Sequence, residues 1–478
     1  MRFICLFLSF SFLLAVQTKV YSQVGMGTTN PNPSSILDIT STTKGVLIPR
    51  MTTAQRNLIG TPAEGLLVFD INEDAFYYYD TTATTWVKLE GSVSRDNYKL
   101  VKSAADLADE LAAGGGTEYL FTDNFLYEIN GTINLAVPIN LNEAYVVGRD
   151  ANEDVLVSAG GTIFSGSQGG SIQKLTLSAP GGTVFNLSGS GAESLIFRDC
   201  IVAGSNSVGS ISNFNLVFTS IVQYVNNTNG VVYADIKELL LNSTGWFGNN
   251  SGVYETFSGD FDIITKQGGF SNVVGATAAL DVTGITSING AAGIRIVDFY
   301  GGGNYINGNS PYAGYNFTND WDINCPGILV ETDGVATGDI NLNYPIGSGA
   351  VTSFSGTGAG SRTKVIGTTT SNNLFRFTSS TDNRIVYDGK KTRYFGVFGS
   401  LSFQGNNNNA IFIFYIAKNG VVVPNTRVYR EVGGNNDVGA VSIVGSIQLT
   451  QGDYIEVWAE RFTGSGNLLT VSLNVIAE

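Results

Sequence analysis

Short runs of alternating apolar and polar residues recur between Ile172 and Phe299, about two dozen residues apart. Alternation of this kind buries one face of a strand and leaves the other face in water. Gly, Ser and Asn fill the spaces, and no helix-length apolar pattern separates the runs. The period favours a solenoid, and the lack of helices favours a right-handed parallel β-helix. The runs are IQKLTL, ESLIFRD, FNLVFTS, DIKELLL, FDIITK and GIRIVDF.

An amphipathic segment, VKSAADLADELAAGGG, precedes these runs. Ser103 is suited to cap the N-terminus of a helix, Leu107 and Leu111 fall on one face of it, and the glycines from Gly114 end it. A helix directly before a solenoid can shield the first rung from water. We therefore expect a β-helix shaft over residues 91–345 that begins with a capping helix.

The C-terminal part of the chain has longer strands of an antiparallel type, such as YFGVFGSLSFQ and AIFIFYIAKNGVVV. The pair Asn419-Gly420 has the composition that a type I′ hairpin turn requires. A Gly-, Ser- and Thr-rich stretch over residues 346–361 predicts a linker ahead of these strands. The expected fold class is therefore all-β, with a right-handed parallel β-helix shaft followed by an antiparallel jelly-roll domain over residues 362–478.

Composition excludes several kinds of function. The chain has 478 residues, a formal net charge of −14 and no histidine. The acidic balance argues against a nucleic-acid partner, because such partners are bound through basic surfaces. The lack of histidine removes Ser-His-Asp triads and His-ligated metals, and we expect no cofactor and no metal site. Cys200 and Cys325 are too few for a disulfide scaffold, and Cys200 is expected to be a buried apolar residue.

Arg2 and the apolar stretch from Ile4 to Val16 predict a secretory signal peptide over residues 1–22. The stretch is too short to span a bilayer, and no later segment is suited to do so. We therefore expect an exported protein, located in the extracellular space, on a cell surface or in a virion, without membrane insertion.

The segment over residues 23–90 contains four motifs in a fixed order. They are GMGTTNP, SSILDITSTTKG, PRMTTAQR and PAEGLLVFD, followed by an aromatic hairpin. This segment resembles the N-terminal module of many Bacteroidetes surface proteins and of tail-fibre-like proteins of the phages that infect them. The resemblance implies a structural module for attachment or stacking. Thr52 and Gln55 also predict a capping box for one short helix from Thr53 to Ile59.

The C-terminal domain is similar to the jelly-roll heads of the C1q and tumour-necrosis-factor class. The similarity is carried by IAKNG and, later, LTQGDYIEVW. It implies a homotrimer with a recognition surface on its outside. The strand over residues 410–417 is apolar on both faces, and a strand of this kind needs cover on both. We expect a second subunit to provide that cover and the head to hold the trimer together.

Two regions could bind a ligand. Near the end of the shaft, aromatic residues lie beside carboxylates, which suits a carbohydrate groove but equally suits a packed terminal loop. In the head, amide-rich loops could bind neutral glycans through hydrogen bonds, and this distal position is the preferred one. The candidate residues are Tyr300, Tyr305, Tyr312, Asp320, Trp321, Asp322, Asn406 and Asn435.

Catalysis on the shaft is the main alternative, because parallel β-helices also host polysaccharide lyases and glycoside hydrolases. Hydrolysis requires carboxylates grouped on one exposed face. The available carboxylates fall at unlike positions within their runs, so we expect no catalytic residues. They are Asp199, Asp235, Asp260, Asp262 and Asp298.

The order of segments predicts a non-enzymatic fibre or adhesin-like protein, on a cell surface or secreted, that attaches to a cell, a glycan or a partner protein. Two alternatives remain: a secreted β-helix lyase or glycoside hydrolase, and a receptor-binding tail-fibre protein of a phage virion. The expected order is a signal peptide (1–22), an attachment module (23–90), the β-helix with its capping helix (91–345), a linker (346–361) and the jelly-roll head (362–478).

Overall fold

The computed structural model describes residues 23–89, 95–275 and 277–478. The expected signal peptide, residues 1–22, lies outside the described residues. The chain forms two compact units, which divide between Arg95 and Asp96.

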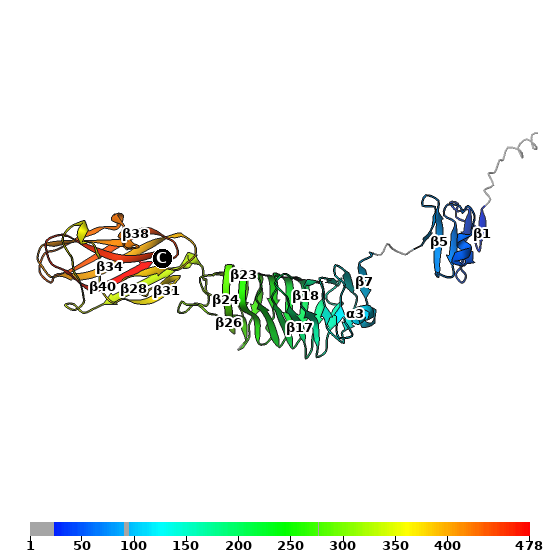
Figure 1. Cartoon of the computed structure of the whole chain (residues 1–478), viewed down its shortest axis with the longest axis horizontal. Coiled ribbons are helices and arrows are strands. Elements are labelled where there is room, and N and C mark those ends of the chain that lie inside the picture. The colour runs from blue at the N-terminus through cyan, green and yellow to red at the C-terminus, as the bar shows by residue number, and fades with distance from the viewer. Residues whose placement is uncertain (1–22, 90–94, 276) are drawn as a thin grey trace, which may run out of the picture. The chain divides into compact units, whose positions relative to one another are not determined.

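The described part of the N-terminal unit, residues 23–89, contains two small sheets and one short helix (Figure 1). The helix α2 (Thr53–Asn57) begins with the expected capping box, in which the Thr52 hydroxyl and the Gln55 side chain each accept a backbone N–H. Arg56 on this helix forms an ion pair with buried Asp70, at 3.2 Å between Nη1 and Oδ2. The strands are β1 (Val24–Met26), β2 (Leu37–Ile39), β3 (Arg50–Met51), β4 (Leu67–Asp70), β5 (Ala75–Asp80) and β6 (Thr85–Lys88).

Large apolar side chains of this unit face solvent in the single chain. Leu58, Ile36 and Leu47 are 82%, 78% and 77% exposed. Among residues 23–89, the buried apolar side chains are Val68 and Ala75. The unit therefore has almost no apolar core of its own. Further exposed apolar residues are Val24, Met26, Leu37, Ile39, Val46, Leu66, Leu67, Ile71, Phe76 and Leu89.

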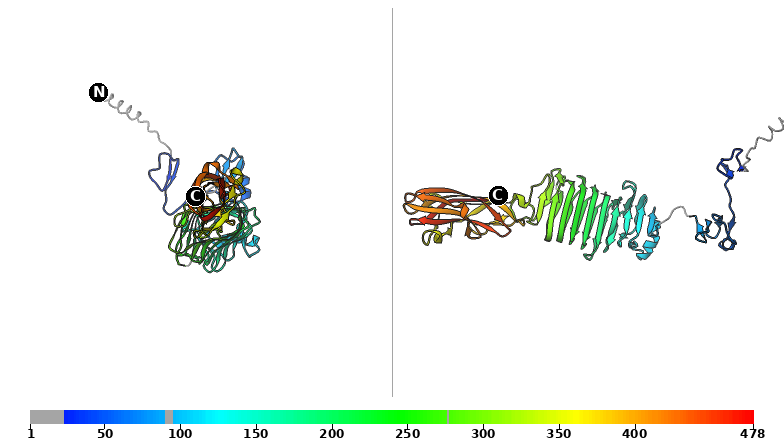
Figure 2. Two further views of the ribbon diagram at one scale, coloured as in Figure 1. Left: turned by 90° about the vertical axis from the view of Figure 1, so that its left-hand side faces the viewer. Right: turned by 90° about the horizontal axis from the view of Figure 1, so that it is seen from above.

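The second unit begins with a parallel β-helix, as predicted (Figure 2). Its strands stack in three parallel ladders, so each turn of the chain adds one strand to each ladder. The partners Leu195, Val217 and Leu239 lie 22 residues apart, which is the expected period. Their side chains are buried in the core that the three ladders surround. Later turns are longer, since Ile264 pairs with Ala292, which pairs with Trp321.

The bounds of the strands follow the three ladders. The first ladder consists of β7 (Tyr98–Val101), β9 (Leu126–Ile129), β12 (Tyr145–Val147), β15 (Gly170–Gln173), parts of β18 (Ser194–Ala203), β20 (Leu216–Val225), β22 (Glu238–Trp246), β23 (Val253–Asn272) and β24 (Ala278–Arg295), and β27 (Trp321–Asn324). The second adds β10 (Thr132–Asn134), β13 (Val155–Val157), β16 (Thr176–Ser178) and β25 (Asp298–Tyr300) to the other ends of β18, β20, β22 and β23. The third consists of β8 (Tyr119–Leu120), β11 (Ile139–Asn140), β14 (Thr162–Gly166), β17 (Thr183–Ser188), β19 (Ser207–Ser212), β21 (Asn229–Ala234), the starts of β23 and β24, and β26 (Asn304–Asn307).

One corner of the β-helix has left-handed backbone in successive turns. The residue that follows the first-ladder strand turns the chain into the second ladder, and its φ lies between 53° and 68°. Asp199 occupies this corner, which explains why its position within its run differs from those of the other carboxylates considered for catalysis. The corner residues are Lys174, Asp199, Ile221, Ser243, Gly268 and Ile296.

The predicted capping helix is confirmed. It consists of η1 (Ala104–Leu107) and α3 (Ala108–Ala113), with Ser103 at its N-cap and Gly114 at its C-cap. Leu107 is fully buried in the core of the β-helix, and Leu111 packs against that core. The helix therefore covers the first rung.

The second unit ends in an antiparallel domain of two sheets that enclose their own apolar core, which confirms the expected jelly-roll part of the fold (Figure 1). Asn419 and Gly420 both have positive φ, as the predicted hairpin turn requires. One sheet contains β31 (Thr370–Phe375), β28 (Thr337–Asn343), β40 (Leu468–Ala477), β34 (Arg393–Gly405), β38 (Val438–Leu449) and β29 (Ala350–Thr352). The other contains β32 (Phe377–Thr378), β33 (Ile385–Tyr387), β39 (Tyr454–Thr463), β35 (Ala410–Lys418), β36 (Val421–Val422), β30 (Thr363–Lys364) and β37 (Val428–Val432); three short helices are η2 (Asp333–Val335), η3 (Ala359–Ser361) and η4 (Pro424–Thr426).

The head begins earlier in the chain than the sequence indicates. Strand β28 was expected in the shaft, but it pairs with β31 and β40 of the head. Strand β29, expected in a linker, also pairs with β40. The alternating run from Thr337 to Asn343 suits a rung of the β-helix and a strand of the head equally well. Its partner β40 lies more than a hundred residues later in the chain. The described β-helix ladders end with β27.

The outer face of β35 is covered within the chain. Ile413 and Tyr415 point away from the head core, yet they are 2% and 3% exposed. Tyr415 lies beneath the guanidinium of Arg362, which is 5.1 Å from its ring centre. The reason given above for a second subunit at this strand is therefore wrong, because the same chain provides the second cover.

Candidate functional site

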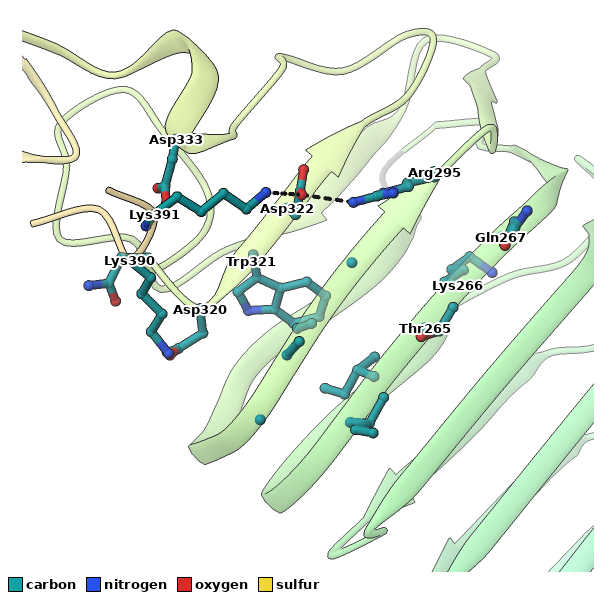
Figure 3. A pocket seen from close by; sticks show the side chains of 17 residues that line it. Thr265, Lys266, Gln267, Arg295, Asp320, Trp321, Asp322, Asp333, Lys390 and Lys391 are labelled. Carbon is teal, nitrogen blue, oxygen red and sulfur yellow. Dashed lines mark hydrogen bonds and ion pairs between the residues drawn. The ribbon is translucent and has the colours of Figure 1, made fainter. Parts of the chain in front are cut away.

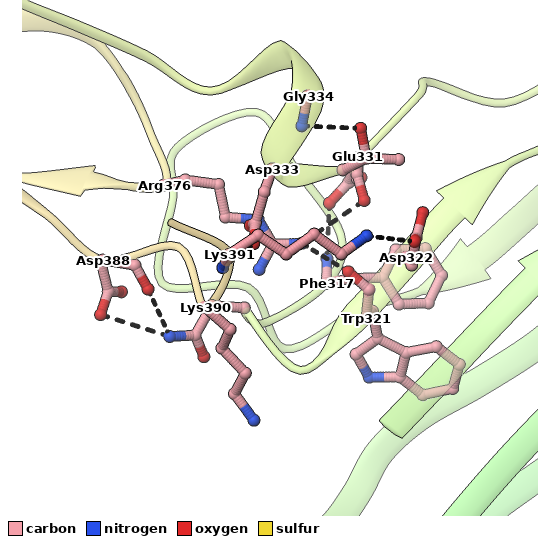
Figure 4. A network of polar contacts seen from close by, with 12 residues as sticks. Phe317, Trp321, Asp322, Glu331, Asp333, Gly334, Arg376, Asp388, Lys390 and Lys391 are labelled. Atoms are coloured by element: carbon pink, nitrogen blue, oxygen red, sulfur yellow. Dashed lines mark hydrogen bonds and ion pairs between the residues drawn. The ribbon is translucent and has the colours of Figure 1, made fainter. Parts of the chain in front are cut away.

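The end of the shaft and the base of the head meet around one buried guanidinium group (Figure 4). Arg376 lies between β31 and β32, is fully buried, and has the left-handed φ of 57°. It donates from Nη1 to the carbonyl of Thr318 and from Nη2 to the carbonyl of Trp321, each at 2.7 Å. Both acceptors belong to the last rung of the shaft. These bonds fix the head on the shaft.

A second group of contacts joins the same two parts. The Tyr312 hydroxyl donates to the Asp388 carboxylate, and the Asn319 amide donates to the Asp388 carbonyl at 2.7 Å. Burial and the neighbouring Asp388 raise the pKa of Tyr312 well above its ordinary value, so its hydroxyl stays protonated. The Tyr315 ring stacks on Phe375 at 4.0 Å between centroids.

A pocket of about 470 Å³ lies beside this junction, on the outer side of the first ladder (Figure 3). The Asp322 carboxylate accepts from Arg295 at 2.8 Å and from Lys391 at 3.0 Å. Asp320 forms an ion pair with Lys390. The two lysines come from the loop between β33 and β34 of the head, so both parts of the unit contribute to the pocket.

The hollow exists because the middle rung has small outward residues. In the ladder, Thr265 of β23 pairs with Gly293 of β24, which pairs with Asp322 of β27. Ala291 lies two residues before Gly293 on β24, also faces outward, and pairs with Ile263. The larger side chains on the outer rungs therefore form walls, and β24 forms the floor.

The structure brings three of the predicted site residues together at this pocket: Asp320, Trp321 and Asp322. Trp321 is 3% exposed and packs against Phe317 in the core of the shaft, so it offers no open ring face. Tyr312 is 4% exposed in the junction and also has no ring face for a sugar. Both rings follow the packed-loop alternative, because Trp321 lies in the core of the shaft and Tyr312 is covered by Phe375 and Asp388 of the head.

The remaining shaft tyrosines lie elsewhere. Tyr300 is 47% exposed on the second ladder, with Phe270 of the preceding rung at 6.2 Å between ring centroids. Tyr305 packs against the core beside Phe299. The sequence therefore predicted a single cluster of aromatic residues at the end of the shaft, whereas the structure places Tyr300 and Tyr305 away from the pocket.

Asn406 and Asn435 lie in loops at the end of the head opposite the junction. The Asn406 side chain accepts from the backbone N–H of Asn467 at 2.6 Å, and the Asn435 backbone N–H donates to the Asn408 side chain at 2.6 Å. These bonds bring three loops together in a surface that we call the tip, consisting of residues 405–409, 433–437 and 464–467. Both predicted tip residues are exposed.

The cations of the pocket, Arg295, Lys390 and Lys391, were not among the ligand-binding residues expected from the sequence. The Lys-Lys pair near a predicted strand was the available signal. Its partners Asp320 and Asp322 are about 70 residues earlier, and alternation along one strand says nothing about a contact with a loop of another domain.

Asp322 in this pocket is held as a carboxylate. Burial opposes the ionisation of Asp322, but the hydrogen bonds and charges of Lys391 and Arg295 outweigh it and lower the pKa of Asp322. A general acid for glycoside hydrolysis requires a raised pKa. The arrangement therefore suits binding by charge and hydrogen bonds.

The fold defines an all-β protein in which a parallel β-helix is followed by a two-sheet antiparallel head. Residues 25–103 match the family described as "Phage tail like trimerisation region". No curated protein matches this chain. Among the described residues, no helix has the length and apolar character needed to cross a membrane.

Three solved structures are similar to parts of this chain. Murine APRIL is 13% identical and covers 30% of this chain and 99% of its own, with a TM-score of 0.20. The enzymatically active domain of tailspike protein 4 from bacteriophage CBA120 is 8% identical and covers 88% of this chain and 78% of its own, with a TM-score of 0.28. The full-length tailspike protein 2 from Escherichia coli O157:H7 bacteriophage CAB120 is 10% identical and covers 88% of this chain and 80% of its own, with a TM-score of 0.19.

Proposed function

We propose that this chain is a tail-fibre-like or adhesin-like structural protein, which assembles as a homotrimer and attaches to a glycan or protein on a cell surface. The observation that carries the proposal is the exposure of apolar residues in the N-terminal unit. Small sheets with two buried apolar residues among 23–89 have too little core to be stable alone. Identical copies can cover one another's apolar residues.

The family match supports the same part of the chain as the site of trimerisation. It covers residues 25–103, which include the exposed apolar residues from Met26 to Leu89 and end at Ser103, the N-cap of the capping helix. The head can add a second contact between copies through β34 and β38, where Tyr394 and Val444 are 66% and 59% exposed. This contact replaces the one expected at β35.

Recognition is assigned to the tip of the head. The tip is rich in Asn side chains and lies on loops, which can vary without disturbing the sheets beneath. Amides donate and accept hydrogen bonds and therefore suit sugar hydroxyls or exposed peptide groups. The buried junction around Arg376 would keep the tip in a constant position relative to the shaft.

We propose that the protein is not an enzyme. Asp320 and Asp322 each form an ion pair with a lysine, and the lowered pKa of Asp322 is unsuited to a general acid. An exported location agrees with the signal peptide expected over residues 1–22. A bacterial surface protein and a component of a phage virion are both consistent with this architecture.

The mass of the full-length protein in solution tests the assembly, by light scattering and native mass spectrometry at micromolar concentration. We expect three chains per particle. Replacing Ile36, Leu47 and Leu58 together with Ser should weaken the trimer, whereas replacing the exposed shaft residue Val232 with Ser should not. A stable monomer at this concentration would overturn the proposal.

A further inference from the structure

We propose that the pocket beside the junction binds a saccharide that carries a carboxylate group. This inference rests on the proposed attachment function, because it gives the ligand class of a second contact in addition to the tip. It concerns the outward residues of the last shaft rungs together with Lys390 and Lys391.

The charges around Asp322 are unequal. One carboxylate faces two cations, since Arg295 and Lys391 both contact Oδ2 of Asp322. The side chains of Arg295 and Lys391 are 60% and 68% exposed, whereas that of Asp322 is 26% exposed. The accessible charge at this place is therefore positive, although the chain as a whole carries −14. A ligand carboxylate would supply the second anion.

The guanidinium of Arg295 can take that anion without losing Asp322. Among the contacts of the described residues, Arg295 bonds to Asp322 through Nη2 alone. The other N–H groups of the planar fork remain available, and a guanidinium binds carboxylates in pairs of parallel hydrogen bonds. The ligand is therefore expected to lie along Arg295, with its charge near Lys391.

The rest of the pocket suits a sugar ring. Its volume of about 470 Å³ falls within the range of small-molecule sites, about 300–1,000 Å³. Ile263, which is 39% exposed, and Ala291 offer apolar surface to the face of a ring. Thr265 and Gln267 point outward, and their side chains make no hydrogen bond within the described part of the chain, so they can bond to hydroxyl groups.

Gly293 provides a precise way to fill the pocket. A Cβ atom placed there would have one neighbour, the carbonyl oxygen of Asp322, at the ordinary contact distance of 3.4 Å. Its backbone is outside the left-handed region, so a side chain brings no strain. Gly293→Val should therefore occupy the floor of the pocket without disturbing the rungs.

The experiment measures binding of the full-length protein to oligosaccharides of uronic or sialic acids, each compared with its methyl ester. The ester keeps the shape of the sugar and removes the charge. The variants are Arg295→Gln, Lys391→Gln and Gly293→Val. The control is Arg198→Gln, because Arg198 is an outward arginine in the same column of the first ladder, where Ser220, Asn242 and Gln267 separate it from Arg295.

We expect at least one acid to bind more tightly than its ester, and to lose about tenfold or more in affinity in each pocket variant but not in the control. Thermal unfolding at the wild-type temperature would show that the variants are folded. The inference is overturned if no acid exceeds its ester, if the pocket variants bind as the wild type does, or if an oligo-aspartate peptide binds equally well. Attachment to cells that depends on the tip but not on these variants would leave the proposed function standing and this inference refuted.

Discussion

Lys266 and Glu255 form an ion pair inside the β-helix, where their side chains are 1% and 2% exposed. Lys266 occupies an inward column in which its neighbours are Leu241 and Ile294. Its ammonium group lies 2.9 Å from Oε2 of Glu255 and donates to the Thr244 hydroxyl at 2.9 Å. The indole N–H of Trp246 donates to the same glutamate at 3.1 Å.

This pair predicts a strong dependence of stability on both partners. Lys266→Met leaves a buried carboxylate without its counter-ion, which should lower the free energy of unfolding by about 3–5 kcal/mol. The double variant Lys266→Met with Glu255→Leu should recover most of that loss, because each residue has aliphatic ladder partners. They are Leu241 and Ile294 for Lys266, and Val231 and Leu280 for Glu255. Urea denaturation of the full-length protein measures the difference. A double variant less stable than the single one would show that the pair stabilises the fold by itself.

The corner residue Ile296 predicts a stabilising substitution. A β-branched residue in left-handed backbone is strained, by about 1–2 kcal/mol, and Asn tolerates this conformation better. Ile296 is also 69% exposed, so little apolar burial is lost on replacement. Ile296→Asn should therefore raise the melting temperature. The matched change Val232→Asn, in strand β21, should lower it, and a decrease for both would contradict the corner argument.

The junction should depend on pH through Asp322. The folded pKa of this group lies below its ordinary value of 3.8, because Lys391 and Arg295 outweigh the effect of burial. The stabilisation is therefore complete above the unfolded pKa and is lost as the pH falls through the lowered value. Asp322→Asn should cost about 1 kcal/mol at neutral pH. This difference should disappear in strongly acidic solution, and a difference that persists there would have another cause.

The pocket predicts an absence of depolymerase activity. Asp320 and Asp322 each form an ion pair with a lysine of the head, and the lowered pKa of Asp322 is unsuited to a general acid. The release of reducing ends from polysaccharides of the natural host measures such activity. Activity that is present in the wild type and lost in Asp298→Asn or Asp320→Asn would require a catalytic shaft.

Local patterns were sufficient to predict the shaft, its cap and the fold class. The period of 22 residues and the capping signals at Ser103 depend on neighbours in the sequence, which alternation and capping rules describe. The run Thr337 to Asn343 was assigned to the shaft because a parallel rung and an antiparallel strand have the same alternation. Its partner β40 is remote, so the sequence does not distinguish the two.

The binding regions were predicted less well than the fold. The tip residues Asn406 and Asn435 are exposed on loops, as amide-rich segments usually are. Trp321 and Tyr312 were expected to meet a ligand, but Trp321 is buried in the core of the shaft and the head covers Tyr312. Lys266 illustrates the same limit, because a single charged residue in a strand reads as solvent-facing until its buried partner Glu255 is known.

Binding of the full-length protein to a glycan array and to whole bacterial cells measures attachment directly. Asn435→Ala removes an exposed tip side chain, and the control Asn373→Ala removes an exposed amide on the edge strand β31 of the head. We expect the wild type and the control to bind and the tip variant to lose binding while it remains a trimer. Unchanged binding by the tip variant would contradict the assignment of recognition to the head.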